Sequence, residues 1–180
     1  MVSLNTPFGT LAFASLFKPR PRSEGAEPVY NATIIFSPAQ QQSAAYKALQ
    51  DACIKTAREE WGEKLNLKEV RMPFRKGEEK EQFDGFNAGD TFIAPWSKNK
   101  PDIVNAQRQL VHLAEDVWAG QTIRMNVTPF AWMNSGKKGV SFGLNHVQIV
   151  KTDGPRIDGR GKAEDVFDDN EVSSEDADLF

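Results

Sequence analysis

The fold of this chain is indicated by residues 123–150, which read IRMNVTPFAWMNSGKKGVSFGLNHVQIV. Apolar and polar side chains alternate over residues 123–133 and again over 140–150, and a period of two is typical of half-buried β-strands. The intervening residues 134–139 are rich in Asn, Ser and Gly and carry two lysines, as expected of a hairpin connection. The apolar parity changes near Asn145-His146, which predicts a β-bulge. The stretch therefore predicts a long β-hairpin.

Two further strands and one principal helix are predicted ahead of this hairpin. Residues 9–17 and 28–36 have the β-branched and aromatic residues of strands, and the proline- and cation-bearing stretch 18–25 between them predicts an exposed loop. A helix is predicted from its capping residue Ser37 to Gly62, which ends it. Its buried face is expected to hold the apolar residues at helical spacing: Tyr46, Leu49, Cys53, Ala57 and Trp61.

The region between the helix and the hairpin is less regular. Residues 70–74 predict a short strand, and residues 104–113 predict a second, shorter helix. Several β segments with one principal helix indicate a mainly β fold. A small antiparallel barrel of the oligonucleotide-binding (OB) type is the expected architecture.

Acidic residues are concentrated at the C-terminal end of the sequence. Residues 164–180 hold eight of the chain's 25 acids and no lysine or arginine. The remaining 17 acids face all 22 bases in residues 1–163, which gives that part a net charge of +5. Like-charged segments of this kind are typical of disordered interaction tails. The sequence therefore predicts a folded domain over residues 1–160 and a disordered acidic tail over residues 161–180.

Composition and motifs exclude several classes of protein. The single cysteine, Cys53, excludes an intrachain disulfide framework, and His112 and His146 lack the spacing of a metal site. The loop motifs of nucleotide-binding proteins and of serine hydrolases are missing from the sequence. Apolar runs are too short to span a bilayer, and the start lacks the order of a signal peptide. We therefore expect a cytosolic protein that is not an enzyme, needs no cofactor and has no membrane partner.

Two alternatives stay open at this point. A small metal-dependent nuclease would need carboxylates to hold magnesium, and five acids lie close together in the sequence: Glu78, Glu79, Glu81, Asp84 and Asp90. A solvated run is the simpler interpretation, because these acids alternate with glycines and lysines. The other alternative is an interaction protein that does not bind nucleic acid and uses its acidic tail to imitate DNA.

Cations lie beside aromatic residues at three places in the sequence. Single-stranded DNA offers a charged backbone and unpaired base faces, so a binder needs cations and flat side chains. The first two places are residues 71–76 and 96–100, and the third is the outer face of the strand over 123–133, provided that Pro129 does not break its register. Together with the two lysines of the hairpin connection, they give the predicted nucleic-acid-binding residues: Arg71, Phe74, Arg75, Lys76, Trp96, Lys98, Lys100, Arg124, Phe130, Trp132, Lys137 and Lys138. For the four aromatic residues, packing in the core is the alternative role.

Several motifs together resemble a known protein family. They are MPFRKGEEK at residues 72–80, FIA at 92–94, KPDIV at 100–104, VWAG at 117–120 and GVSFGLNHVQIV at 139–150. Their order and spacing resemble a bacteriophage family of single-stranded-DNA-binding proteins, first catalogued as a domain of unknown function. The resemblance covers roughly residues 2–160, and it implies an OB barrel that coats and protects single-stranded DNA in phage replication, recombination or repair. It departs from the family at Phe74-Arg75, where Pro-Leu-Arg is common, and at residues 118–120, where Tyr-Ser-Gly is.

The end of the sequence carries a second resemblance. Residues 176–180 read DADLF, similar to the tails of replication single-strand binders of short-tailed phages. This resemblance implies that Asp176, Asp178, Leu179 and Phe180 dock a phage or host DNA polymerase, helicase or recombinase, and that the tail competes with DNA. The expected place of action is the cytoplasm of the infected cell. Weak binding to duplex DNA and a homodimer are left open.

Overall fold

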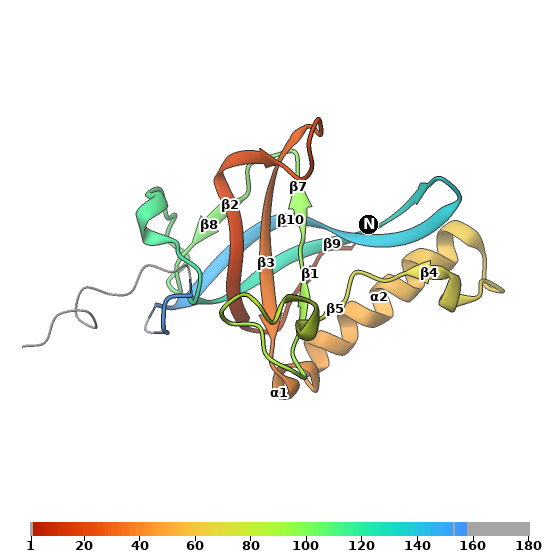
Figure 1. Ribbon diagram of the computed structural model, residues 1–180, viewed down its shortest axis with the longest axis horizontal. Helices are drawn as coiled ribbons and strands as arrows, with labels where there is room; N and C mark the ends of the chain where they lie inside the picture. The colour runs from red at the N-terminus through yellow and green to blue at the C-terminus, as the bar shows by residue number, and fades with distance from the viewer. Residues whose placement is uncertain (1, 153, 158–180) are drawn as a thin grey trace, which may run out of the picture.

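The structure is a computed structural model that describes residues 2–152 and 154–157. The predicted hairpin forms its two long C-terminal strands (Figure 1). Strands β9 (Thr122–Asn134) and β10 (Lys137–Lys151) pair antiparallel along their whole length. Ser135 and Gly136 connect them with φ values of 50° and 76°, the left-handed conformations of a type I′ turn. The register shifts between Leu144 and His146, which confirms the predicted bulge.

The main strands close into a barrel. β9 pairs with β10, β10 with β7 (Trp96–Ser97), β7 with β3 (Pro28–Phe36) and β3 with β2 (Gly9–Pro21). β2 then returns to β9, so the ring is complete. A closed ring of five strands satisfies the backbone groups that a sheet edge would leave open. The predicted mainly β, OB-like fold is confirmed.

Shorter strands extend this ring. β1 (Leu4–Asn5) adds to β9, and β6 (Thr91–Ile93) adds to β3 and carries β5 (Arg75–Lys76). β4 (Val70–Arg71) and β8 (Asp102–Val104) lie parallel to β10. Three short 3-10 helices occupy the connections: η1 (Leu67–Glu69), η2 (Gly77–Lys80) and η3 (Ala114–Asp116).

The core forms where the inward strand faces meet the principal helix. Alternation on β9 buries Ile123, Met125 and Val127 almost completely, as their spacing predicted. The helix α2 (Ala44–Trp61) packs its predicted face against them, with Tyr46, Leu49, Cys53 and Ala57 buried and Trp61 half-buried at its end. Burial raises the pKa of the Cys53 thiol to about 12, so this side chain is a packing group.

The predicted helix over Ser37–Gly62 is two helices. α1 (Pro38–Gln41) begins at the cap Ser37 and ends at Gln42, and α2 begins at a second cap, Ser43. The Ser43 hydroxyl accepts a hydrogen bond from the Tyr46 amide, so the chain restarts the helix there. Gly62, with φ of 95°, ends α2 as predicted.

The predicted second helix over residues 104–113 was wrong. β8 pairs with β10 instead, and Val104 bridges Leu110. The side-chain oxygen of Asn105 accepts hydrogen bonds from the amides of Gln107 and Gln109, which stabilises a turn in place of a helix. The predicted loop over residues 18–25 starts later than expected, because β2 continues to Pro21 as an exposed arm paired with the start of β3.

The second cap gives a stability prediction. Replacing Ser43 by alanine leaves an amide at the start of α2 without its acceptor, and we expect a loss of about 1 kcal/mol in the free energy of unfolding. Urea unfolding followed by circular dichroism measures this loss. Ser23→Ala, in the exposed connection after β2, is the matched control and should leave the midpoint unchanged. Equal midpoints for the two variants would contradict the capping role.

Candidate nucleic-acid interface

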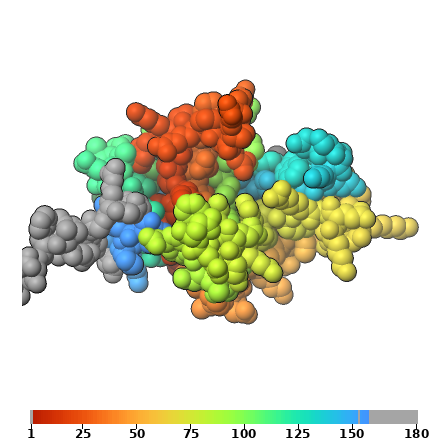
Figure 2. Space-filling model, viewed as in Figure 1, coloured from red at the N-terminus to blue at the C-terminus, as the bar shows by residue number. Residues whose placement is uncertain are grey.

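A cavity of about 360 Å³ opens on the outside of the barrel. Its walls come from the connection after β2, from residues 71–75, from β7 and from the β9–β10 hairpin. Figure 2 shows the end of β2 at the top, the hairpin at the right and the yellow and yellow-green segments below them on one face of the molecule. Five of the predicted nucleic-acid-binding residues line this one cavity: Arg71, Arg75, Trp96, Phe130 and Trp132. The structure therefore brings together the three places that the sequence singled out.

Strand β9 keeps its alternation through Pro129. Phe130 and Trp132 lie on the face opposite to Ile123 and Val127, as predicted, and Pro129 pairs in register with Phe142. Proline is tolerated here because, in the described part of the chain, β9 past Val127 has a strand neighbour only in β10. The missing amide is thus not needed by a second strand.

The three aromatic side chains are held in fixed orientations. The rings of Trp96 and Phe130 meet edge to face, with centroids 5.6 Å apart and an interplanar angle of 84°. The Trp132 indole nitrogen donates a hydrogen bond to the Ser141 hydroxyl at 2.9 Å. The same ring lies over Gly139, where an added Cβ would collide with it. All three rings are half-buried, so each keeps surface available to a ligand.

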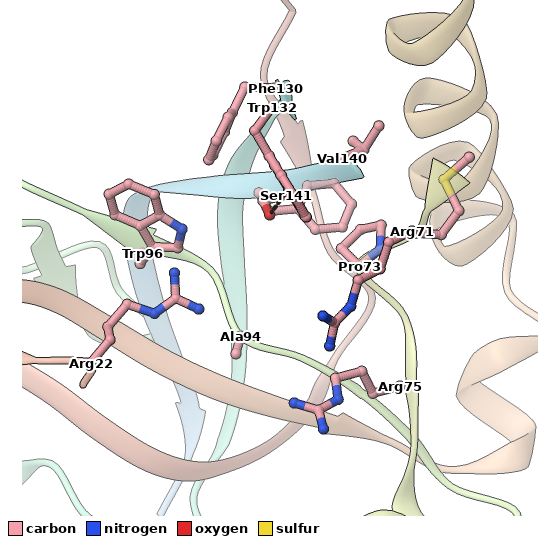
Figure 3. A pocket seen from close by; sticks show the side chains of 12 residues that line it. Arg22, Arg71, Pro73, Arg75, Ala94, Trp96, Phe130, Trp132, Val140 and Ser141 are labelled. Carbon is pink, nitrogen blue, oxygen red and sulfur yellow. Dashed lines mark hydrogen bonds between the residues drawn. The ribbon is translucent and has the colours of Figure 1, made fainter. Parts of the chain in front are cut away.

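Three arginines surround these rings. Figure 3 shows the guanidinium groups of Arg22, Arg71 and Arg75 facing a common open space below the rings of Trp96, Phe130 and Trp132. The Arg22 guanidinium lies 5.4 Å from the centre of the Trp96 ring, within cation–π range. Arg75 donates to Glu79 from Nε at 2.9 Å, and this hydrogen bond lowers the pKa of the Glu79 carboxyl. Cations and flat rings in one cavity are the groups that a nucleic-acid strand requires.

Arg22 was missed by the sequence analysis. The cations of residues 18–25 were assigned to an exposed loop, and the loop was not assigned to the site. The signal that could have found Arg22 is the run of cations and prolines KPRPR at residues 18–22, placed directly between two predicted strands. In an OB barrel the connection between the first two strands is one of the two loops that border the binding face.

The five predicted lysines and Phe74 lie outside the lining of this cavity, and three of the lysines and Phe74 have other neighbours. Lys98 forms an ion pair with Glu27 at 2.8 Å, which raises the pKa of Lys98 and lowers that of Glu27. Lys100 lies over the Phe17 ring and Lys138 over the Trp61 ring, while Lys76 and Lys137 are exposed. Phe74 packs on Tyr46 and Phe142, with centroids 5.3 and 5.8 Å away, so its alternative role in the core fits its position.

Arg124 lies on the same face of β9 as Phe130 but outside the cavity lining. Its Nε donates to Gln148 at 2.7 Å, and its guanidinium lies 5.5 Å from the centre of the Phe8 ring. The predicted tail residues Asp176, Asp178, Leu179 and Phe180 fall outside the residues that the structure describes. The same holds for the predicted boundary between domain and tail.

Three of the five acids of residues 78–90 form contacts with groups in or next to their own loop. Glu79 pairs with Arg75, Glu78 accepts a hydrogen bond from the Gly89 amide, and Asp90 accepts one from the Asn87 amide. Within residues 2–152 and 154–157, no three His, Cys, Asp or Glu side chains come together as a metal site. The described helices also include none that is long and apolar enough to cross a membrane.

Comparisons with solved structures show the fold. The single-stranded DNA-binding protein of bacteriophage Enc34, solved in complex with ssDNA, superposes with a TM-score of 0.72 at 19% identity, covering 85% of this chain and 88% of that one. A second structure of the same phage protein gives a TM-score of 0.68 at 19% identity, covering 92% of this chain and 90% of that one. The single-stranded DNA-binding protein gp2.5 of bacteriophage T7 gives 0.62 at 14% identity, covering 89% and 97%.

A family model adds evidence at the level of sequence. No curated protein sequence matches the chain. The family described as "Enterobacter phage Enc34, ssDNA-binding protein" matches residues 5–179. That range includes all the described strands of the barrel except the first residue of β1. Because the match spans nearly the whole sequence, this chain belongs to the family of the ssDNA-binding protein of Enterobacter phage Enc34.

Proposed function

We propose that this chain coats single-stranded DNA by stacking bases on Trp96, Phe130 and Trp132 while Arg22, Arg71 and Arg75 neutralise phosphates. The observation that carries the proposal is the convergence of three oriented rings and three guanidinium groups in one cavity. Every base has a flat face and every nucleotide a phosphate, so these contacts bind DNA with little dependence on sequence. Coating of this kind protects the strand and removes its secondary structure during phage replication, recombination or repair.

The remaining predicted cations suit the margins of the bound strand. Lys137 and Lys138 begin β10 at the hairpin that borders the cavity, and Lys76 follows Arg75 on β5. Lys98 and Lys100 follow Trp96 along the chain. Long-range attraction from such side chains accelerates binding and is screened by salt. We assign them to the capture of the backbone and not to the recognition of bases.

Residues 1–160 act as the DNA-binding domain in this proposal, and residues 161–180 as an acidic tail. The tail competes with DNA for the basic cavity and docks a phage or host polymerase, helicase or recombinase. Support comes from the charge asymmetry between the two parts, +5 for residues 1–163 and eight acids without a base in residues 164–180. The place of action is the cytoplasm of the infected cell.

A mobility-shift experiment tests the proposed function. The full chain is mixed with labelled oligo(dT), a duplex of matched length and an RNA of matched length, each with and without magnesium. We expect a shift of oligo(dT) at lower protein concentration than for the duplex, with the oligonucleotide intact in both conditions. Magnesium-dependent shortening of the label would support the nuclease alternative. The absence of any shift, even after removal of residues 164–180, would support the interaction protein that does not bind DNA.

The tail carries its own prediction. A tethered acidic segment reaches a high effective concentration at the basic cavity, so deleting residues 164–180 should tighten oligo(dT) binding severalfold at low salt and less at high salt. Equilibrium binding by fluorescence anisotropy measures the change. A chain of full length whose acids in residues 164–180 are replaced by amides is the control, and it should behave like the deletion. Equal affinities of all three chains at every salt concentration would show that the tail does not compete.

A further inference from the structure

We infer that the DNA path continues beyond the cavity, along the outer face of β9 and β10, to a second aromatic–arginine contact formed by Phe8 and Arg124. This inference rests on the proposed function, because it extends the same binding site. The second contact would bind another stretch of the same single strand, with a base on the Phe8 ring and a phosphate at the Arg124 guanidinium. We call the surface between the two contacts the β9–β10 floor, and it consists of Asn126, Thr128, Gly143 and Asn145.

The floor is continuous with the cavity through strand pairing. Gly143 pairs with Thr128 of β9 on one side and with Trp96 of β7 on the other. The cavity residue Trp96 therefore borders the floor directly. An added Cβ at Gly143 would meet only the Thr128 carbonyl oxygen, at 3.5 Å, so packing does not require a glycine there. The missing side chain leaves room above the sheet next to Trp96.

Hydrogen bonds between side chains hold the floor in place. The Asn145 amide group donates to both Asn126 Oδ1 and Thr128 Oγ1 at 2.9 Å, and Asn126 donates in turn to Asn5 at 2.9 Å. These groups are half-buried or exposed and carry no charge. Such a surface can hydrogen-bond to the edges of bases without the desolvation cost of buried charges.

The far end of the floor repeats the pairing found at the cavity. Arg124 lies 5.5 Å from the centre of the Phe8 ring, as Arg22 lies 5.4 Å from that of Trp96. Gln148 accepts the Arg124 Nε hydrogen bond and donates to the Asn105 carbonyl oxygen at 3.2 Å, so the guanidinium is oriented. Phe8 is 46% exposed, which leaves one side of its ring for a base.

The spacing of the two contacts fits a single bound strand. Phe130 and Arg124 are six positions apart on β9, which corresponds to about 20 Å at about 3.3 Å per residue. A stacked strand advances about 3.4 Å per nucleotide, so this path takes about six nucleotides, within the roughly 4 to 16 that OB folds bind. An acid lies beside the floor: the Asp102 carboxylate is 4.0 Å from Nδ1 of His146.

A length series of oligo(dT) tests the inference. Anisotropy titrations use a short oligomer of about 3 nucleotides, too short to reach both contacts, and a long one of about 15 nucleotides, toward the upper end of the site sizes known for OB folds. Phe8→Ala and Arg124→Gln should each weaken binding of the long oligomer about fivefold or more and leave the short one unchanged. Trp96→Ala should weaken both. The second variant guards against a folding defect in Phe8→Ala, because Arg124→Gln removes the charge but keeps a long polar side chain.

Phe83→Ala is the matched control. Phe83 is 41% exposed and has the Lys80 ammonium 5.4 Å from its ring centre, but it lies in the loop between η2 and β6. This variant should bind both oligomers like the unaltered chain. Unchanged binding of the long oligomer by both the Phe8 and Arg124 variants, or equal losses at both lengths, would overturn the inference. Those outcomes would leave the proposed role of the cavity intact. Unchanged binding of both oligomers by the Trp96→Ala variant would instead contradict the proposed function itself.

Discussion

Replacing Trp96 by alanine is expected to weaken oligo(dT) binding by about five- to 150-fold, which corresponds to about 1–3 kcal/mol for the loss of one stacked base. The ring is oriented by Phe130 and covered on one side by the Arg22 guanidinium, so the free protein already holds it ready for a base. A preorganised contact loses little free energy to ordering when the ligand binds. Fluorescence anisotropy with labelled oligo(dT) measures the affinity.

The control for this prediction is Trp118→Ala. Trp118 also has a guanidinium near its ring, with Arg156 5.1 Å from the centre, but it lies outside the cavity lining. We expect its affinity for oligo(dT) to stay near that of the unaltered chain. Thermal unfolding of each variant separates binding from packing. A large fall in the melting temperature of Trp96→Ala with unaltered affinity would assign that ring to the core and not to the DNA.

Replacing Arg22, Arg71 and Arg75 together by glutamine is expected to make the affinity for oligo(dT) much less dependent on salt. Each phosphate contact contributes about 0.7 to the slope of log affinity against log salt for single strands. Loss of three contacts should therefore reduce that slope by about 2, with the largest loss of affinity at low salt. Titrations at a series of salt concentrations measure both quantities.

A second triple variant removes the same charge elsewhere. Lys47 and Lys55 lie exposed on α2 and Lys64 lies exposed just after it, so their replacement by glutamine changes the net charge equally. This variant should keep the slope and lose only a little affinity through the long-range field. Equal slopes for the two triple variants would show that net charge, and not contacts in the cavity, sets the salt dependence.

Local periodicity explains why much of the fold was predictable. The β9–β10 hairpin, its bulge, the buried face of α2 and the end at Gly62 follow from patterns within a few residues of each other. The failures depended on competing local chemistry. Asn105 stabilises a turn where apolar spacing suggested a helix, and Ser43 restarts a helix that the spacing alone would continue. Membership of the Enc34 family confirms the first of the two resemblances, and with it the prediction of a DNA-binding protein that is not an enzyme.

The composition of the site was predictable, but its geometry was not. Arg71, Arg75 and Trp96 were predicted as binding residues because each lies in a short stretch where cations and aromatic residues are close together. Arg22 reaches the cavity because the connection between β2 and β3 lies at its edge. That position depends on the closed barrel and cannot be seen in the local sequence. In the same way, Phe74 satisfies the local pattern but turns toward Tyr46 in the core.

Ultraviolet crosslinking of the full chain to oligo(dT), followed by mass spectrometry of the crosslinked peptides, tests the central claim most directly. Crosslinks form only where a base lies against a side chain, so their positions identify the bound surface. We expect crosslinks at Trp96 and at Phe130 or Trp132, and we expect them to disappear when an excess of free oligo(dT) competes for the protein. Crosslinks confined to Trp61 or Trp118, with none at the three cavity residues, would contradict it.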